Sequence, residues 1–432
     1  MAGRWILYWM GLDNKKRDMT PFDMSRKPVK QFPPLLLLLW GAALILTPGL
    51  KKNKIRMEGL KPPFLVYSTH QGFSDYYIVP RMLFPRRANY VSDMEGFAAF
   101  GNKAYRAGGC IGKRRYVPDV SVMLNIRYAL KKLKQTVVLF PESRHCDAGV
   151  TSTLPDNLGK LAKFLDVPLV VIYSHGCYLA NPFWDEDHTR KVRMESTAEL
   201  LFTREELRKA SAEEVQRLVE EKLQYDEYAW QKESGVKIKY AARAEGLHLP
   251  LYQCRACGVK GKMRSGGADL WCEKCGSRWT LTEDGELRNH DTGEIQNIPA
   301  WYMQERKQVE EEIAEGTYKG LDIPVRVEAL PNEKGFVPLG TGRLLFSHEG
   351  FYLSLDEERN KSADYRPIFF PSRKLESLQT EYNYRKHGKC IVLSTKDCCY
   401  YVYSDDESFI VTELEFAAER FHAISLKDAR DS

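Results

Sequence analysis

The chain has 432 residues, of which 43% are hydrophobic, so it can bury a sizeable core, which argues against global disorder. At this length we expect two to four domains. The formal net charge is +6, but residues 1–134 carry 24 Lys and Arg against 8 Asp and Glu, a formal +16, which leaves −10 for the remainder. This asymmetry predicts an anionic partner for the first third, either a membrane surface or a phosphorylated substrate. Nucleic acid is not expected, because the basic residues interleave with apolar runs.

Residues 1–60 predict a membrane-contact region. Residues 35–46 are apolar throughout and predict a short helix, which Pro48 and Gly49 would end. Twelve helical residues span about 18 Å, against a hydrocarbon core of about 30 Å, so we expect an interfacial or half-inserted helix rather than a bilayer span. A buried core helix is the alternative. Residues 5–10 are too short for a secretory signal. Basic residues on both flanks suit anionic lipid: Lys27, Lys30, Lys51, Lys52, Lys54 and Arg56.

An α/β domain with a helical extension is predicted over residues 61–245. Its strands are expected at residues 64–67, 89–91, 136–140 and 169–173, and they alternate with helices at 75–84 and 120–134. Such alternation is typical of a mostly parallel sheet that is covered by helices. Residues 192–202 suggest an edge strand or a loop. Two capping boxes follow, at Thr203–Glu206 and Ser211–Glu214, and the second is expected to open a helix that runs to about Lys232.

A histidine and an aspartate five residues apart, His70 and Asp75, lie between the first strand and the first helix of this domain. Acyl transfer to an alcohol needs a base near the hydroxyl proton, and neutral imidazole serves well. A carboxylate beside it holds the tautomer and stabilises the imidazolium that forms. The alternative is structural: Asp75 or Ser74 only caps the helix.

Three further segments follow in order. Residues 109–115 combine glycines with Lys113, Arg114 and Arg115, residues 140–142 read Phe-Pro-Glu, and Pro168 precedes the strand at 169–173. Glu142 comes directly after an apolar strand, at the end of the strand where open α/β sheets place their sites. With His70 and Asp75, these segments make residues 61–184, under a third of the chain, resemble the 1-acyl-sn-glycerol-3-phosphate acyltransferase family.

The resemblance assigns roles to particular residues. His70 would be the base and Asp75 its orienter. The family's G-x-x-x-x-x-R pattern matches from Gly109 to Arg115, whose guanidinium would clamp the acceptor phosphate, and it also matches from Gly108 to Arg114.

The family's F-P-E-G-T-R-S block is altered in this chain. Glu142 is kept and would contact acceptor hydroxyls or nearby basic groups. Ser143, Arg144 and His145 replace the family's glycine, threonine and arginine. Either Arg144 takes the phosphate role or His145 does so more weakly.

The function implied is that of a membrane-associated O-acyltransferase of phospholipid biosynthesis, at the cytoplasmic face of the cell membrane, peripheral or monotopic. Its donor would be acyl-CoA or an acyl-carrier protein, and its acceptor a lysophospholipid, first of all 1-acylglycerol-3-phosphate, with no catalytic metal. One alternative is an enzyme for another lysolipid or an amino-alcohol, favoured by the altered block. Another is an inactive lipid-binding scaffold. A nucleic-acid-binding ribbon protein would need a basic C-terminal half, which this chain lacks.

A zinc ribbon is predicted over residues 246–295. Its ligands come from two CxxCG knuckles that are 14 residues apart, and this spacing predicts a closed, tetrahedral, structural Zn²⁺ site, with iron as the main rival. The other six cysteines show no spacing pattern, which indicates a reducing compartment rather than a disulfide framework. The ligands are Cys254, Cys257, Cys272 and Cys275.

After a helical connector at residues 296–321, the segment 322–432 predicts a third type of domain. About six short strands are separated by Gly, Asn or Asp turns, and residues 412–424 form one amphipathic helix. This order resembles a pleckstrin-homology-like or GRAM-like β domain closed by a helix.

Overall fold

The computed structural model describes residues 13–14, 16–185, 188–356 and 367–431. The chain divides into two compact units. The first unit contains Asp23–Lys113 and Pro118–Ile238, and the second contains the described part of residues 10–22, Arg114–Val117 and the described part of residues 239–432. The first twelve residues of the predicted membrane-contact region, with the segment 5–10, lie outside the described residues.

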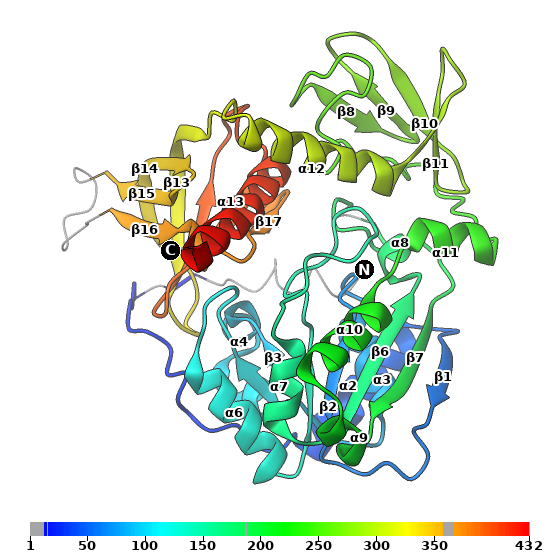
Figure 1. Ribbon diagram of the computed structural model, residues 1–432, viewed down its shortest axis with the longest axis vertical. Coiled ribbons are helices and arrows are strands. Elements are labelled where there is room, and N and C mark those ends of the chain that lie inside the picture. The colour runs from blue at the N-terminus through cyan, green and yellow to red at the C-terminus, as the bar shows by residue number, and fades with distance from the viewer. Residues whose placement is uncertain (1–12, 15, 186–187, 357–366, 432) are drawn as a thin grey trace. The chain divides into compact units, whose positions relative to one another are not determined.

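A seven-stranded, mostly parallel sheet forms the centre of the first unit (Figure 1). All neighbours pair in parallel except β6 and β7, which are antiparallel. The predicted mostly parallel sheet is therefore confirmed. In spatial order the strands are β1 (Lys51–Ile55), β7 (Glu195–Phe202), β6 (Leu169–His175), β2 (Leu65–Ser68), β5 (Thr136–Leu139), β3 (Ala88–Ser92) and β4 (Cys110–Gly112).

The prediction of an edge strand or a loop at residues 192–202 is wrong, because β7 lies inside the sheet, between β1 and β6. The sequence Lys-Lys-Asn-Lys-Ile of β1 has no apolar alternation, and its residues are mostly exposed. It forms a strand because its backbone pairs with β7, with Lys51 opposite Glu195. The pattern of apolar and polar side chains could not predict this strand, because it is held mainly by backbone hydrogen bonds to β7.

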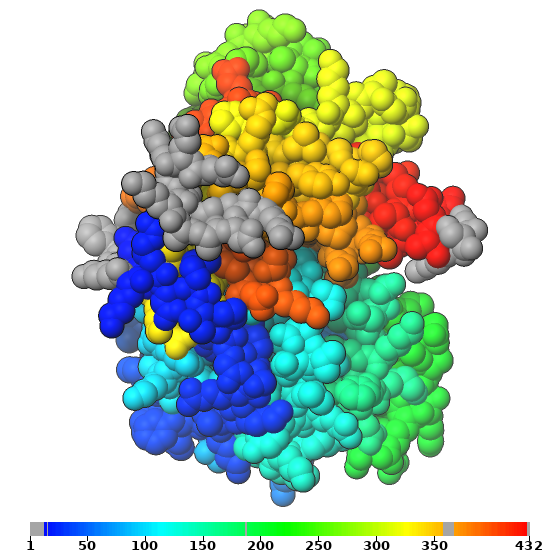
Figure 2. Space-filling model, turned by 90° about the vertical axis from the view of Figure 1, so that its left-hand side faces the viewer, coloured from blue at the N-terminus to red at the C-terminus, as the bar shows by residue number. Residues whose placement is uncertain are grey.

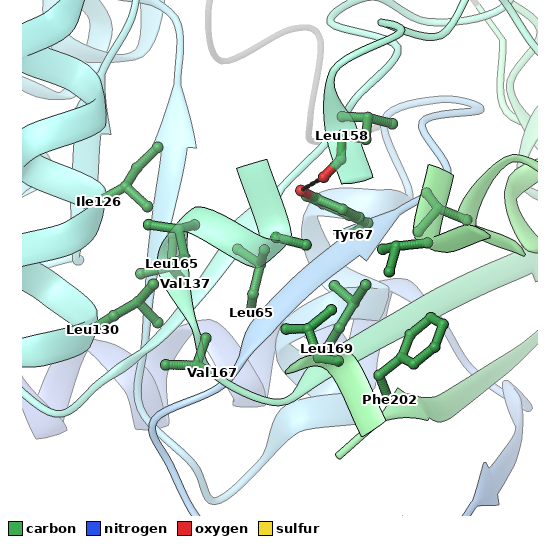
Figure 3. Close-up of a cluster of buried hydrophobic side chains, with 14 of the residues drawn as sticks. Leu65, Tyr67, Ile126, Leu130, Val137, Leu158, Leu165, Val167, Leu169 and Phe202 are labelled. Atoms are coloured by element: carbon green, nitrogen blue, oxygen red, sulfur yellow. Dashed lines mark hydrogen bonds between the residues drawn. The ribbon is translucent and has the colours of Figure 1, made fainter. Parts of the chain in front are cut away.

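Helices cover both faces of the sheet. Leu65 and Tyr67 of β2 point to one face, against α6 (Val120–Lys131), α7 (Leu158–Leu165) and α10 (Ala212–Leu223), and the Tyr67 hydroxyl donates to Leu158 O at 2.9 Å (Figure 3). Val66, between them, points to the opposite face, where α3 (Asp75–Leu83) packs. This alternation is the two-residue period of a strand that is buried on both sides. Three further short helices of the unit are α4 (Met94–Phe100), α5 (Asn102–Ala107) and α8 (Cys177–Ala180).

The predicted helix from Ser211 to about Lys232 is two helices. The capping box at Thr203 and Glu206 opens α9 (Arg204–Lys209), and Ser211 caps α10 as expected. Helix α10 ends at Leu223, and α11 (Glu227–Ser234) begins anew because the Asp226 side chain accepts hydrogen bonds from the amides of Tyr228 and Ala229. An aspartate inside an apolar-periodic run thus serves as a second N-cap.

The short apolar helix is present as α2 (Pro33–Leu46). Its residues Leu36 and Ala43 are buried, and the Trp40 ring stacks on Phe84 with centroids 4.2 Å apart. Within the described part of the chain, no helix has the length and apolarity needed to cross a membrane. Residues 23–32, which precede α2, are bonded to the rest of the unit: Asn125 Nδ2 donates to Met24 O at 2.8 Å. Figure 2 shows this blue segment beside the cyan surface.

The second unit contains the ribbon and the β domain. The ribbon sheet runs β12 (Ile295–Asn297), β11 (Glu286–Asn289), β10 (Arg278–Leu281), β9 (Asp269–Cys272) and β8 (Met263–Gly266), and α12 (Ile298–Ala314) follows it. An antiparallel seven-stranded sheet then packs with the last helix, α13 (Val411–Asp431). Its spatial order is β16 (Ile368–Pro371), β15 (Gly350–Leu355), β14 (Val337–Ser347), β13 (Leu321–Leu330), β19 (Cys399–Tyr403), β18 (Cys390–Ser394) and β17 (Gln379–Glu381).

The β-rich C-terminal part and its final helix are thus as predicted, with one more strand than expected. Strand β17 has only three residues, all buried, and pairs with β18. The resemblance of this part to a pleckstrin-homology-like or GRAM-like domain stays a prediction.

Candidate active site and metal centre

Polar side chains gather where three neighbouring parallel strands of the first unit end. His70 follows β2, Glu142 follows β5, and His175 is the last residue of β6. Because the carboxyl ends of parallel strands meet at one edge of a sheet, the fold brings these three residues to the same edge.

His70 and Asp75 form the pair that the sequence predicted. His70 Nδ1 lies 3.3 Å from Asp75 Oδ2, and both residues are buried. The Gly72 amide donates to the same carboxylate oxygen at 3.1 Å. Asp75 is the first residue of α3, where the helix dipole favours negative charge. With the Nδ1 proton directed at Asp75, Nε2 carries the lone pair that can accept a proton.

Aromatic rings surround the imidazole of His70. Its centroid lies 4.5 Å from that of Phe140, 4.3 Å from that of His145 and 5.6 Å from that of Tyr76. These rings limit the orientations that the imidazole can adopt, so its two ring nitrogens have defined directions.

Glu142 holds the backbone of the His70 loop. Its Oε1 accepts from the His70 amide at 2.8 Å, and its Oε2 accepts from the Ser152 amide and the Tyr225 hydroxyl, both at 2.9 Å. Burial raises the pKa of this carboxyl, while these three hydrogen bonds oppose the rise. The predicted contact of Glu142 with an acceptor hydroxyl stays a prediction; the contacts present here position His70.

The Arg144 guanidinium donates to Asp147 Oδ2 at 2.5 Å, and both residues are buried. The preceding residue, Ser143, has a φ of 59°, so the chain turns sharply between Glu142 and Arg144. Ser143, which stands where the resemblance places a glycine, thus has a left-handed backbone conformation. The phosphate roles predicted for Arg144 and for His145 stay predictions.

Arg114 and Arg115 belong to the second unit. The Arg114 guanidinium is buried and donates to three carbonyl oxygens, those of Lys396 at 2.6 Å, Asp397 at 2.9 Å and Pro331 at 3.0 Å. Arg115 is half-buried. The phosphate contact predicted for these arginines stays a prediction.

A second histidine–carboxylate pair, which the sequence did not reveal, lies at the same sheet edge. His175 Nδ1 is 3.0 Å from Glu227 Oε1, and the imidazole stacks on Trp230 with an interplanar angle of 7°. Glu227 is fully buried, and its pKa is raised by that burial against the hydrogen bonds from His175 and Gly176. Glu227 begins α11 and is 52 residues from His175, so no local pattern connects the two.

The four predicted zinc ligands converge in the second unit. Cys254 Sγ lies 3.7 Å from Cys275 Sγ, Cys257 Sγ lies 3.9 Å from Cys272 Sγ, and all four sulfur atoms are within 4.8 Å of one another. A tetrahedral Zn²⁺ with bonds of about 2.3 Å places its sulfur ligands about 3.8 Å apart. The cluster therefore fits one structural metal ion, with no position left for a substrate.

No protein-family model and no curated protein matches the chain. Among solved structures, part of the chain is similar to the crystal structure of the 1-acyl-sn-glycerophosphate (LPA) acyltransferase PlsC from Thermotoga maritima. The comparison has a TM-score of 0.36 at 16% sequence identity, and it covers 43% of this chain and 75% of that chain. At this level of similarity, the site geometry alone has to support a function.

Proposed function

We propose that the protein is a membrane-associated O-acyltransferase that moves a fatty acyl group from acyl-CoA or an acyl-carrier protein to a lysophospholipid, with 1-acylglycerol-3-phosphate as the preferred acceptor. The observation that carries the proposal is the 3.3 Å contact between His70 Nδ1 and Asp75 Oδ2 at the carboxyl edge of a parallel sheet. In the tautomer that donates Nδ1–H to Asp75, the imidazole has an Nε2 lone pair that can accept a proton, which is what hydroxyl attack on a thioester requires.

The reaction would proceed as follows. His70 Nε2 removes the proton of the acceptor hydroxyl while the oxygen attacks the thioester carbonyl carbon. As the new C–O bond forms and the C–S bond breaks, the imidazolium, stabilised by Asp75, returns the proton to the thiolate. The products are the acylated lipid and the free thiol of the donor.

Two observations favour Arg115 over Arg114 as the phosphate ligand. A Cβ on Gly109, which has a φ of 95°, would lie 2.5 Å from Ala88 O, so the register that begins at Gly109 contains the glycine that the backbone requires. The Arg114 guanidinium already serves three carbonyl groups. We therefore expect Arg115→Ala to raise the acceptor's KM more than the donor's. If only Arg114→Ala has that effect, the glycine–arginine pattern runs from Gly108 to Arg114 instead of from Gly109 to Arg115.

Membrane association is supported by the exposed residues of α2 and β1. Leu37, Leu38 and Ile45 of α2 are 58%, 70% and 77% exposed. The lysines of β1 are also exposed. An apolar helix face that is followed in the chain by basic residues suits the boundary of an anionic membrane, with the protein peripheral or monotopic at its cytoplasmic face.

A different acceptor is the second candidate. The buried ion pair between Arg144 and Asp147 uses a guanidinium in the block where the family recognises its acceptor. An acceptor without the phosphate of 1-acylglycerol-3-phosphate, such as another lysolipid or an amino-alcohol, would need no guanidinium contact from this block.

One experiment tests these proposals together. The purified protein is incubated with acyl-CoA, acyl-carrier-protein thioester and a mixture of lysolipids and amino-alcohols, and the products are identified by mass spectrometry. We expect acylated 1-acylglycerol-3-phosphate from the wild type, and about 10²–10⁴-fold less from His70→Ala, because the general base is lost. His290→Ala, which changes an exposed histidine of the second unit, is the control. Vesicle binding without any acylated product would instead identify a lipid-binding scaffold.

A further inference from the structure

The residue next to His70 is held by contacts that its own sequence neighbourhood does not supply. Gln71 is fully buried, and its Nε2 donates to Ser174 O at 2.7 Å and to Glu227 Oε1 at 3.2 Å. Its carbonyl oxygen lies 3.6 Å from Cys146 Sγ. Side-chain hydrogen bonds therefore connect Gln71 both to the end of β6 and to the start of α11.

Glu227 is the carboxylate at the centre of these contacts. Its Oε1 receives Gln71 Nε2 and His175 Nδ1, and its Oε2 accepts from the Gly176 amide at 2.7 Å. All of these partners lie outside α11, the helix that carries Glu227. A buried carboxylate is costly unless its donors are present, so the free energy of this group depends on keeping the His70 loop and the end of β6 in place.

We propose that Glu227 is a positioning residue for His70 and acts through Gln71. The inference rests on the proposed function and deepens it, because it names a third residue that holds the proposed base in place. Asp75 orients the imidazole, Glu142 holds the His70 amide, and Glu227 holds the next residue in the chain. A misplacement of about 1 Å in such a group can lower a rate by about 10²-fold without loss of the group itself.

The substitution Glu227→Gln tests this with little change in volume. An amide has one acceptor oxygen where the carboxylate has two. When that oxygen faces the Gly176 amide, the new NH₂ group faces the NH₂ group of Gln71, and the contact between residues 227 and 71 is lost. His175 can change its tautomer to accept the new proton, whereas Gln71 could accept it only by turning its amide, which would place its Oε1 against Ser174 O. We expect kcat to fall about 10²-fold while the KM for the acyl donor is unchanged.

The matched control is Glu199→Gln in the same unit. Glu199 lies on β7, where it pairs with Lys222 at 3.0 Å and accepts from the Tyr173 hydroxyl at 3.3 Å, and neither partner belongs to residues 70–72. A second variant, Gln71→Met, removes the other end of the contact and keeps a side chain of similar length, so it tests the proposal even if Glu227→Gln does not fold. The double variant should lose less activity than the sum of the two single losses, because both variants remove the contact between residues 71 and 227.

A readout that needs no turnover is the imidazole NMR signal of His70, assigned by its absence in His70→Ala. We expect this signal to shift in Glu227→Gln and in Gln71→Met, but not in Glu199→Gln. Folded variants with wild-type kcat and an unshifted His70 signal would overturn the inference, as would additive losses in the double variant. If the wild type forms no acylated product while the signal still responds to residue 227, the proposed function fails and the positioning role stands.

Discussion

The His70 backbone amide donates a 2.8 Å hydrogen bond to Oε1 of Glu142, which lies 72 positions further along the chain. His70 and the glutamate of the Phe-Pro-Glu segment thus belong to one structural assembly. It follows that Glu142 affects His70 directly, whether or not it also touches an acceptor.

The substitution Glu142→Gln should destabilise the protein. The carboxylate accepts two backbone amides and one hydroxyl, and an amide side chain leaves the His70 or the Ser152 amide facing an NH₂ group. A buried donor without an acceptor costs about 1–3 kcal/mol. We expect the free energy of unfolding in urea to fall by about that amount, with reduced turnover. Glu221→Gln, at an exposed position, should stay within about 0.5 kcal/mol of the wild type. Equal stability of both variants would contradict the role assigned to Glu142.

The exposed face of α2 should contribute to membrane binding. Ile45 is 77% exposed, and replacing it by Glu places a negative charge on the apolar face that we expect to meet lipid. Co-sedimentation of Ile45→Glu with anionic vesicles should be weaker than that of the wild type, and deletion of residues 1–60 should weaken it further. Ile295→Glu, an exposed isoleucine of the ribbon, is the control. Equal sedimentation of the wild type and Ile45→Glu would exclude this face.

The cysteine cluster should bind one Zn²⁺ per chain, and its loss should reduce stability more than turnover. The metal's effect should extend beyond the ribbon, because α12 holds the residue before Cys254: the Gln253 amide donates to Glu305 at 2.7 Å, and its carbonyl accepts from Trp301 Nε1 at 3.0 Å. Metal binding to such a site is coupled to folding. In Cys272→Ser we expect a lower Tm and faster hydrogen exchange in residues 250–290 and in α12.

Elemental analysis and kinetics check the zinc prediction. Cys399→Ser, at a cysteine outside the cluster, should keep its zinc. Absence of zinc in protein purified without chelator would refute the first part. A folded Cys272→Ser protein without turnover would show that the ribbon shapes the active site.

Stability should depend on pH through Glu305. This carboxyl is buried in α12, and desolvation raises its pKa well above the ordinary 4.5. The folded state therefore binds the proton more tightly than the unfolded state does. The contribution to stability is complete below pH 4.5 and is lost as the pH rises through the folded-state pKa.

Glu305→Gln resembles the protonated carboxyl and should remove this loss. In urea unfolding from pH 5 to pH 8, the advantage of the variant over the wild type should grow with pH, by at most about 1.4 kcal/mol per pH unit for one proton. Taking the difference between two zinc-loaded proteins at each pH cancels effects common to both. A constant difference across this range would mean that Glu305 does not titrate there.

The elements that the sequence predicted well are those whose signal is local. The apolar runs of β2, β5 and β6 indicate buried strands, and both CxxCG knuckles bring their thiolates together within a few residues. The His70–Asp75 pair belongs to this class, because five residues from a strand end into a helix leave little freedom in how the two side chains meet.

Other features follow only from the tertiary structure. The polar segment Lys51–Ile55 becomes a strand because β7 offers its backbone, and one helical pattern splits in two at Asp226. Glu142 and Glu227 find their donors 72 and 156 residues away, at His70 and Gln71. A buried carboxylate specifies only that donors must exist; which groups supply them depends on the strands and helices that packing brings together at the sheet edge.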